Sequence, residues 1–333
     1  MYRLLFCLLT LPTIQAASDG HSWAYSGNEG ESNWPIKYSF CGGVYQSPLD
    51  FHRSILQYDS TLEPIRLYGY NASSTDSFTI INNGHTVSVN LLLSMYMEIP
   101  PFRYIASELH FHWGNLASPT GSEHCIGGKR FAAELHIVHY NSKYADINVA
   151  METADGLAVL GILIEIGSFN PTYDKIFSQL TNIKYKGQQT QIPGFNVQDL
   201  VPKSLDSYYR YEGSLTTPPC YPSVLWSVFR NPVFISEEQL SFLETALYCT
   251  EWNSSAPLEM TDNYRHLQKE GGRLVSVSFR EGIVLTVVLA SLLGVLVLTA
   301  VTCWFLRKRK RGKTTKAILY TAAVPMEENA SKV

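Results

Sequence analysis

Residues 108–114 read Glu-Leu-His-Phe-His-Trp-Gly, and residues 133–136 read Ala-Glu-Leu-His. These two stretches hold three of the nine histidines in the chain. Successive side chains of a strand alternate between its faces, so His110 and His112 project to one side and the apolar residues between them to the other. A neighbouring strand could present His136 beside this pair.

Three neutral imidazoles with one coordination position left open are typical of a catalytic zinc site, whereas a structural site is closed by a fourth protein ligand. The sequence therefore predicts that His110, His112 and His136 bind Zn²⁺. The alternative is that each is an ordinary strand histidine, and this is the favoured interpretation for any lone histidine. The His-x-His spacing on an apolar strand, with a third histidine in a similar context, favours the metal.

The chain has 333 residues, of which 45% are hydrophobic and 17% are charged. It can bury a large core, and its length allows one large domain or two smaller ones. No linker of low complexity and no internal repeat interrupts residues 20–280, so we predict one domain there. Strand-like runs dominate it, which predicts a mostly β fold with a large sheet and short peripheral helices.

The expected strands are apolar, β-branched or aromatic runs separated by turn signals such as Asn83-Gly84 and Asn170-Pro171. They are residues 78–81, 86–90, 107–113, 133–139, 157–166, 208–211, 223–229 and 273–279. The nearly continuous apolar run 157–164 predicts a central strand that is buried on both faces. One clear helix begins after Ser236, a good N-cap followed by two glutamates.

Both ends of the chain carry targeting signals. Residues 1–16 combine Arg3 with an apolar run and end in small residues, which predicts a signal peptide cleaved near Ala16. Residues 283–306 are 24 residues without a charge, and at about 1.5 Å per residue they can cross a hydrocarbon core of about 30 Å as a transmembrane helix. The next five residues are all basic. Basic residues favour the cytoplasmic side, so residues 307–333 are predicted to form a cytoplasmic tail, with the large domain outside the plasma membrane.

The charge distribution argues against a nucleic-acid partner. The net charge is −3, but the tail from Arg307 holds 8 basic and 2 acidic residues. Without this tail and Arg3, 17 basic residues face 27 acidic ones. The acidic domain would repel phosphate backbones, whereas the basic tail suits anionic lipid headgroups. Thr286, Ala290 and Gly294 recur every four residues in the expected membrane helix, which suggests a homodimer, although such spacings are common by chance.

Four cysteines lie in the expected outer domain, namely Cys41, Cys125, Cys220 and Cys249. An oxidising compartment permits disulfides, but four cysteines allow three fully paired connectivities, and the sequence alone does not choose among them. Asn71 and Asn253 each begin an Asn-x-Ser motif on the same side of the membrane. Both are predicted to be glycosylated.

Four motifs occur together and in order: His-Phe-His-Trp-Gly at 110–114, Gly-Ser-Glu-His at 121–124, Ala-Glu-Leu-His at 133–136 and Ser-Leu-Thr-Thr-Pro-Pro at 214–219. From about Trp23 to Phe279 the chain resembles an α-carbonic anhydrase, and its anchor and tail are similar to those of membrane-bound members of that family. The resemblance implies a large, mostly antiparallel twisted sheet that holds zinc. It also implies reversible hydration of CO2 to bicarbonate and a proton.

The resemblance implies roles for five further residues. Thr216 matches the residue that accepts a hydrogen bond from the zinc-activated hydroxide and donates its own to a buried carboxylate, here Glu123. His85 matches the proton shuttle, and Asn83 and Tyr25 match residues that order the proton-carrying waters. Without the family match, these would be read as ordinary turn or surface residues.

A metal-bound histidine usually donates its other ring N–H to an acceptor. By resemblance, Glu134 accepts from His136, and the backbone carbonyl of Asn263 accepts from His112. The family usually places a glutamine at the third such position, but this chain has Glu108. We predict that an ionised Glu108 raises the pKa of the zinc-bound water. The alternative is that it simply accepts the hydrogen bond that glutamine would accept.

An apolar substrate needs a dry wall beside the nucleophile. The residues that match this pocket are Val138, Val159, Leu215, Thr217, Val224 and Trp226. The alternative for such residues is plain core packing, and both can hold at once. Cys41 and Cys220 match the disulfide of extracellular family members, and their bond is expected to brace the loop that carries Thr216.

Two other functions are alternatives. A domain of this kind that had lost catalysis would serve as a receptor or adhesion module, and the loss of a zinc histidine would mark it. All three histidines are present, together with Thr216, Glu123 and His85, which disfavours this alternative. Ester hydrolysis by the same hydroxide would be a side activity.

Overall fold

The computed structural model describes residues 22–280 and 283–321. Contacts divide the chain into two units, one ending at Phe279 and the other beginning at Arg280. The expected signal peptide, residues 1–16, and the end of the expected tail, residues 322–333, lie outside the described part of the chain.

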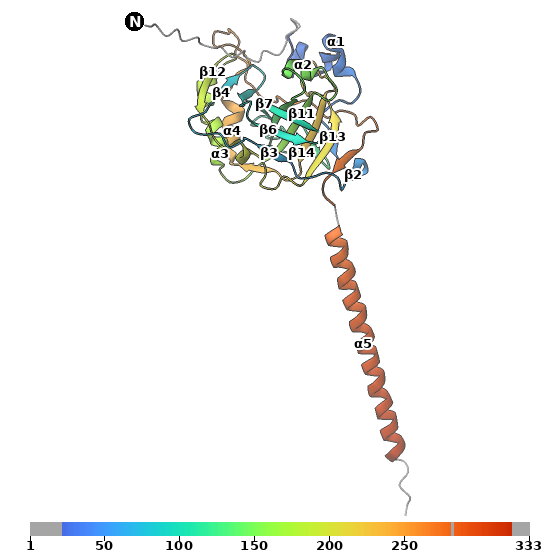
Figure 1. The fold of residues 1–333 in the computed structure, drawn as a ribbon. Coiled ribbons are helices and arrows are strands. Elements are labelled where there is room, and N and C mark those ends of the chain that lie inside the picture. The colour runs from blue at the N-terminus through green and yellow to red at the C-terminus, as the bar shows by residue number, and fades with distance from the viewer. Residues whose placement is uncertain (1–21, 281–282, 322–333) are drawn as a thin grey trace, which may run out of the picture. The chain divides into compact units, whose positions relative to one another are not determined.

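A large mixed sheet forms the first unit (Figure 1). Its main path runs through β12 (Gln189–Pro193), β4 (Ser77–Asn82), β5 (Val87–Asn90), β7 (Phe102–Trp113), β10 (Ala133–Asn141), β11 (Leu157–Ile166), β14 (Val224–Phe229), β13 (Tyr208–Gly213), β16 (Val275–Val277) and β2 (Leu56–Tyr58). Off this path, β15 (Val233–Ile235) pairs with β11, and β6 (Tyr96–Ile99) joins β3 (Arg66–Tyr68) to β7. A separate small sheet contains β1 (Asp50–Phe51), β8 (Cys125–Ile126) and β9 (Lys129–Arg130). Most pairs are antiparallel, and the parallel pairs in the large sheet are β11–β14, β11–β15 and β16–β2. The predicted fold class is confirmed.

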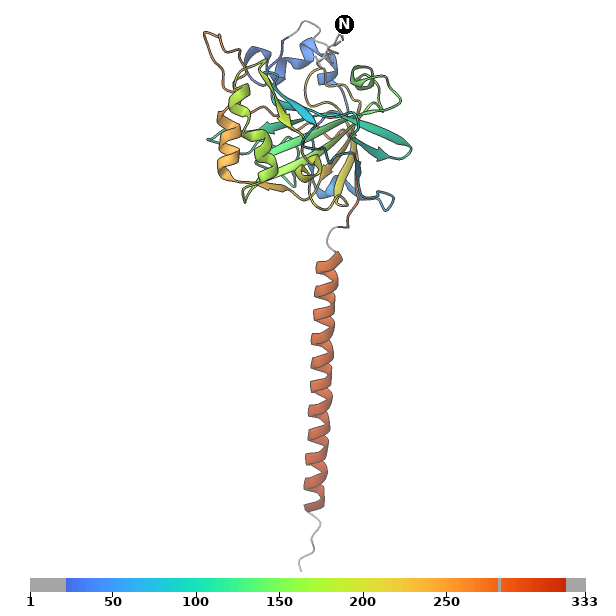
Figure 2. The same cartoon turned by 60° about the vertical axis from the view of Figure 1, so that its left-hand side comes forward.

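Helices are short in this unit. They are α1 (Trp34–Lys37), α2 (Ile147–Met151), α3 (Pro171–Phe177) and α4 (Glu237–Thr245), with 3-10 turns η1 (Gly27–Glu29), η2 (Glu31–Asn33), η3 (Ser39–Gly42), η4 (Arg53–Ile55), η5 (Leu180–Ile183) and η6 (Val197–Leu200). The predicted N-cap of α4 is confirmed, because Ser236 and Gln239 form a reciprocal capping box. Figure 2 shows α3 and α4 side by side, and both pack into the larger core cluster.

The alternation of side chains in the central strands separates two core clusters. Leu109, Phe111 and Trp113 of β7 belong to the larger cluster, so the opposite face of this strand is left to the histidines. In β11, Leu160 and Ile162 belong to the larger cluster, and Val159 belongs to the smaller one. β11 is therefore buried on both faces, as its apolar run predicts.

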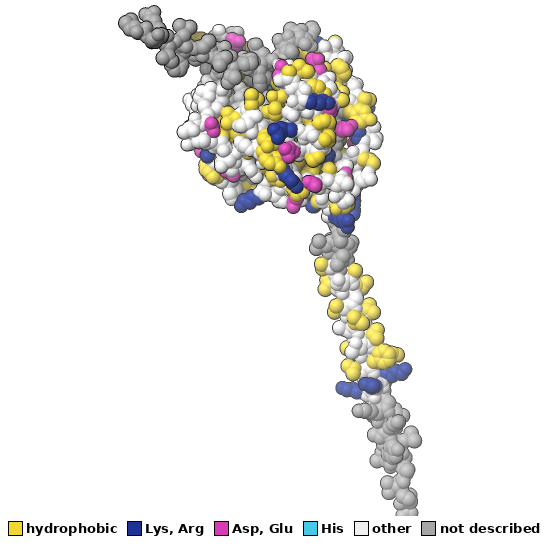
Figure 3. Space-filling model, viewed as in Figure 1, with side chains coloured by type: hydrophobic (Ala, Val, Ile, Leu, Met, Phe, Trp, Pro, Cys, Tyr) yellow, Lys and Arg dark blue, Asp and Glu magenta, His cyan; other side chains and the backbone are white. Residues whose placement is uncertain are grey.

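The second unit contains α5 (Ile283–Thr321). Within it, Val288–Lys310 is the one span among the described residues that is long and apolar enough to cross a membrane. On the face visible in Figure 3, apolar side chains are followed by lysine and arginine. The helix begins at Ile283 and continues past Leu306 through the basic run.

Cys41 and Cys220 form the disulfide expected from the family resemblance. Of the other two cysteines in this unit, Cys125 is buried and Cys249 is half-buried, and both are free thiols. Asn71 and Asn253 are exposed, as a glycosylated residue must be.

Candidate active site

Two neighbouring strands bring the three histidines together. β7 and β10 are antiparallel, with His136 opposite His110 and Glu134 opposite His112. His136 Nδ1 lies 3.1 Å from His112 Nε2 and 3.3 Å from His110 Nε2. The side chain of His110 is 18% exposed and that of His136 is 1% exposed, so the cluster is reached from the His110 side.

Each imidazole uses its other nitrogen to bond an acceptor. His110 Nδ1 donates to Glu108 Oε1 at 2.7 Å, and His136 Nε2 donates to Glu134 Oε1 at 2.9 Å. His112 Nδ1 donates to the carbonyl oxygen of Asn263 at 2.8 Å. Each acceptor shows which nitrogen of its ring carries the hydrogen in the neutral imidazole. The three nitrogens that face one another, His110 Nε2, His112 Nε2 and His136 Nδ1, therefore carry lone pairs.

This arrangement fits a divalent metal ion. Three facing lone pairs repel one another unless a cation lies between them. A tetrahedral ion with nitrogen ligands at about 2.0–2.1 Å would place those nitrogens roughly 3.3–3.4 Å apart, close to the separations of His136 Nδ1 from its two partners. Imidazole nitrogens are also the donors that zinc prefers.

The protonation of the histidines agrees with this role. Burial lowers the pKa of His112 to about 3 and that of His136 to about 4. Burial also acts to lower the pKa of His110, but the charge and hydrogen bond of Glu108, together with the charges of Glu123 and Glu134, raise that pKa above its ordinary value. His112 and His136 are thus neutral at pH 7 and available as metal ligands.

A second set of close polar groups contains His124, Glu134 and His136. Glu134 Oε1 accepts from His124 Nδ1 at 2.7 Å, and its Oε2 accepts from the His124 backbone N–H at 2.8 Å. Burial alone would raise the pKa of Glu134, but the two imidazoles hold it well below its ordinary value. These groups already satisfy one another by hydrogen bonds, so they support the histidine cluster and do not form a second metal site.

Glu123 is buried behind the histidines. Its Oε1 accepts from the backbone N–H of Arg265 at 2.8 Å and lies 3.4 Å from His112 Nδ1. Its Oε2 has no well-aligned donor among the described residues. Burial raises the pKa of Glu123, while His136 and a hydrogen bond from Thr216 oppose this rise. The structure thus brings Thr216 to Glu123, as the resemblance implies.

An apolar wall stands beside His136. Val138 of β10 is opposite Val159 of β11, which in turn is opposite Trp226 of β14. The Trp226 and His136 rings are 4.7 Å apart. The other members of the predicted pocket lie close by, since Val224 is buried in the same cluster and Leu215 packs against it. Thr217 is half-buried in the loop that follows Thr216.

His85 lies at the edge of the site in a stacked position. Its ring is parallel to that of Trp23, with 3.8 Å between the centroids and an angle of 7°. Burial, and then the charge of Lys186, lowers its pKa to about 4. This is far below the value near 6.5 that suits a proton shuttle. The Trp23 indole covers one face of the ring.

The two residues expected to order waters lie near His85. The Asn83 side-chain oxygen accepts from the backbone N–H groups of His85 and Thr86 at 2.8 and 2.9 Å, so it shapes the turn that presents His85. Tyr25 packs edge-on against Trp23 with ring centroids 5.3 Å apart. Burial, and then the charge of Glu123, raises the pKa of Tyr25 well above its ordinary value, so it stays a neutral hydroxyl.

The matched motifs form one cluster in space, and the domain that carries them matches a known family. Residues 29–279 match the family model described as eukaryotic-type carbonic anhydrase.

The chain belongs to the carbonic anhydrase family.

Named relatives agree with this family. Human carbonic anhydrase 12 is 49% identical over an alignment of 341 residues, which covers 98% of this chain and 96% of the human protein. Carbonic anhydrase 6 from Canis lupus familiaris is 41% identical, covering 83% of this chain and 87% of its own. Human carbonic anhydrase 6 is 39% identical, and the alignment covers 83% of this chain and 90% of the human protein. As a carbonic anhydrase, the chain is a carbonate dehydratase, and enzymes of this family generally depend on zinc.

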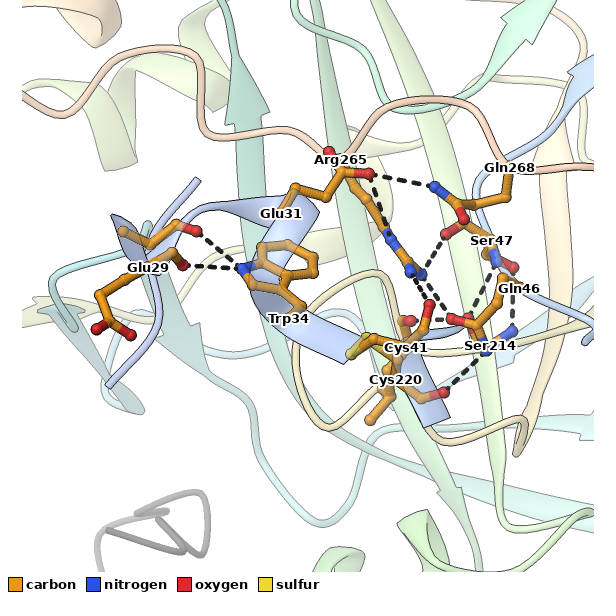
Figure 4. Close-up of a disulfide and its surroundings, with 12 residues drawn as sticks. Glu29, Glu31, Trp34, Cys41, Gln46, Ser47, Ser214, Cys220, Arg265 and Gln268 are labelled. Carbon is orange, nitrogen blue, oxygen red and sulfur yellow. Dashed lines mark hydrogen bonds and ion pairs between the residues drawn. A yellow bond between two sulfur atoms is a disulfide. The ribbon is translucent and has the colours of Figure 1, made fainter. Parts of the chain in front are cut away.

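Sequence reasoning missed the residue that ties this carbonic anhydrase site to its disulfide. The buried guanidinium of Arg265 donates to Gln46 Oε1 at 2.8 Å and to the carbonyl oxygens of Ser47 and Cys41 at 2.9 and 3.0 Å. Gln46 in turn donates to the Cys220 carbonyl oxygen at 3.2 Å, as Figure 4 shows. Arg265 stands in no motif, so no signal in the sequence pointed to it.

Proposed function

We propose that this carbonic anhydrase hydrates CO2 reversibly at a zinc ion held by His110, His112 and His136, on the outer surface of the cell. The observation that supports these ligands is the convergence of their lone pairs, with His136 Nδ1 at 3.1 and 3.3 Å from the other two nitrogens. A bound zinc ion would lower the pKa of its water to about 7, a value established for carbonic anhydrases rather than obtained from this geometry, and so supply hydroxide at neutral pH.

The chain would hold these ligands through their second nitrogens. Glu134 and the Asn263 carbonyl fix two of the rings, and Glu108 fixes the third. Such acceptors set the tautomer and orientation of metal-bound imidazoles. Glu108 differs from the other two because its side chain is 19% exposed and it adds a negative charge near solvent.

Thr216 and Glu123 would orient the nucleophile. The Thr216 hydroxyl would donate its hydrogen to the buried Glu123 carboxylate, and its contact with that carboxylate lowers the Glu123 pKa against the effect of burial. The Thr216 oxygen can then only accept, so a hydroxide beside it would donate its hydrogen there and turn a lone pair toward the substrate. The Arg265 N–H keeps the Glu123 carboxylate in place.

The apolar wall would hold CO2 beside that lone pair. Val138, Val159 and Trp226 offer no hydrogen-bonding side-chain group to the substrate side, because the indole Nε1–H of Trp226 is committed to the Ser214 carbonyl oxygen at 3.0 Å. Such a surface accepts an apolar molecule without stranding a polar group. Val224, Leu215 and Thr217 complete the pocket.

His85 would carry the proton to solvent, with Asn83 and Tyr25 ordering the waters between. A pKa of about 4 makes the stacked imidazole a poor proton acceptor at pH 7. We therefore propose that His85 takes up the proton when its ring is turned away from Trp23. In that orientation the pKa of the imidazole would approach 6.5.

The membrane arrangement extends the same proposal. Residues 1–16 would be a cleaved signal, residues 20–280 the extracellular domain with a short stalk, residues 283–306 the transmembrane helix and residues 307–333 the cytoplasmic tail. The five basic residues that follow Leu306 support this orientation. We also propose that the protein forms a homodimer, in which the transmembrane helices of two copies pack through Thr286, Ala290 and Gly294.

The deciding experiment measures CO2 hydration and zinc content of the full-length protein and of His110→Ala. We expect the wild type to hold one zinc and to be active, and the variant to lose both. An inactive wild type with full zinc content would refute the proposed reaction, and an active wild type without zinc would refute the proposed centre.

A further inference from the structure

A buried hydrogen-bond chain leads from the candidate ligand His136 to the loop that carries Thr216. Beyond Glu134 it contains His124, Tyr211 and Ser47. The side chains of His124 and Glu134 are fully buried, and Tyr211 is 3% exposed. Water does not reach these groups, so each must obtain its hydrogen-bond partner from the protein.

The donors and acceptors of this hydrogen-bond chain follow from Glu134. A carboxylate only accepts, so His136 Nε2 and His124 Nδ1 must both be protonated to reach its Oε1 at 2.9 and 2.7 Å. In neutral His124 the remaining nitrogen, Nε2, is then an acceptor. The Tyr211 hydroxyl lies 2.6 Å from it and is the group that can donate.

The Tyr211 oxygen has a second neighbour. Ser47 Oγ is 2.9 Å away and holds the phenol oxygen from its other side. Ser47 is fixed in turn by Ser214, because each backbone N–H donates to the other residue's hydroxyl oxygen at 3.0 Å; Figure 4 shows this pair. A Cβ at Gly213 would lie 2.2 Å from Ser47 Oγ and 2.7 Å from Tyr211 Cε2, so the glycine leaves room for this approach.

We infer that Tyr211 is a positioning residue for His136: by donating to His124 Nε2 it fixes the tautomer in which both imidazoles bond Glu134, and this leaves His136 Nδ1 unprotonated for zinc. The inference rests on the proposed zinc centre. Without the phenol hydroxyl, His124 Nε2 is a buried acceptor with no donor. If the ring then turns or changes tautomer, Glu134 loses a donor that orients it, and His136 is held less firmly.

The test compares zinc binding by full-length wild type, Tyr211→Phe and Tyr208→Phe, using a competing chelator to obtain the dissociation constant and a chase to obtain the release rate. Tyr208 is a matched control, because it lies on the same strand, is 2% exposed and donates its hydroxyl to the Glu63 carbonyl oxygen at 2.7 Å. We expect Tyr211→Phe to bind zinc about tenfold more weakly, the usual scale for loss of an outer partner, and Tyr208→Phe to bind it as the wild type does.

Ser47→Ala keeps the phenol and removes only the hydroxyl beside it, so it serves if Tyr211→Phe does not fold. It should weaken zinc binding in the same direction and by less. Equal zinc affinity in wild type and in the folded variants overturns the inference while leaving the zinc centre intact. A wild type that does not bind zinc overturns the proposed centre instead, so the two failures are distinguishable.

Discussion

Glu108 accepts the Nδ1–H of His110 at 2.7 Å, and its side chain is 19% exposed. A carboxylate at this position places a negative charge near the proposed zinc site, whereas an amide would place none there. A nearby negative charge stabilises a neutral water relative to hydroxide. We predict that Glu108→Gln shifts the midpoint of the pH–rate profile for CO2 hydration to lower pH by about one unit.

The matched control is Glu98→Gln on β6, because Glu98 is exposed and its nearest cation, Arg103, is 3.7 Å away. This change removes the same charge from the protein but at the surface, so it should leave the profile in place. If Glu108→Gln also leaves it in place, Glu108 acts only as a hydrogen-bond acceptor.

His85 gives a second prediction at the scale of one residue. Its stacked ring has a pKa of about 4, caused first by burial and then by Lys186. Because this is below the ordinary value near 6.5, the stability that neutral His85 contributes is complete above pH 6.5 and is lost as the pH falls toward 4. Replacing the covering ring, Trp23→Ala, should raise the pKa of His85 by at least about one unit toward 6.5.

NMR titration of the His85 imidazole measures this shift directly. Trp34→Phe provides a control. Trp34 packs edge-on against Trp23 with ring centroids 5.3 Å apart, and this substitution keeps an aromatic ring beside Trp23, so it should leave the His85 pKa unchanged. A His85 pKa that stays near 4 in Trp23→Ala would mean that other neighbours bury the ring.

The loop between β13 and β14 shows how one element depends on distant ones. The Cys41–Cys220 disulfide closes a sequence separation of 179 residues, for which the chain-entropy model gives about 5 kcal/mol. We predict that the paired change Cys41→Ala with Cys220→Ala lowers the free energy of unfolding by up to this amount. It should also slow CO2 hydration, because the Thr216 loop loses its brace.

Cys125→Ala is the control for that experiment, since it removes a buried free thiol and no cross-link. Denaturant unfolding and the hydration rate should be measured on the same samples. Loss of stability without loss of activity would show that Arg265 and Ser47 hold the loop by themselves.

Elements with long apolar runs were predictable from the sequence. β7, β10 and β11 follow the alternation expected of them, because each buries a regular set of side chains. β12 was not predicted, because of its five residues only Ile192 is buried and its pattern is polar. Asn170-Pro171 is typical of a turn, yet the Asn170 side chain caps α3 and Pro171 occupies its first turn. The same residues favour either structure locally, and packing decides.

The site combines residues that sequence distance separates. The three proposed metal ligands and Glu134 come from two adjacent strands, and the alternation of side chains predicts that they share a face. Asn263 and Arg265 reach the site from over 140 residues away from their partners, and the stack of His85 on Trp23 crosses 62 positions. Such contacts depend on how distant segments of the chain pack around the sheet, and no local sequence pattern predicts them. The family resemblance supplied Asn263, while Arg265 and the low pKa of His85 emerged only from the structure.

At the scale of the whole molecule, membrane orientation decides which face of the cell receives the bicarbonate and protons. Asn71 and Asn253 lie in the first unit and are exposed, whereas a third Asn-x-Ser motif begins at Asn329 beyond the basic run. N-linked glycans are added only on the side that becomes extracellular. With the domain outside, removal of glycans from the full-length protein should lower its apparent mass, and Asn71→Gln and Asn253→Gln should each abolish one step of that change. Asn329→Gln is the internal control and should change nothing. Glycan on Asn329 with none at the other two would reverse the orientation, and with it the side on which CO2 is hydrated.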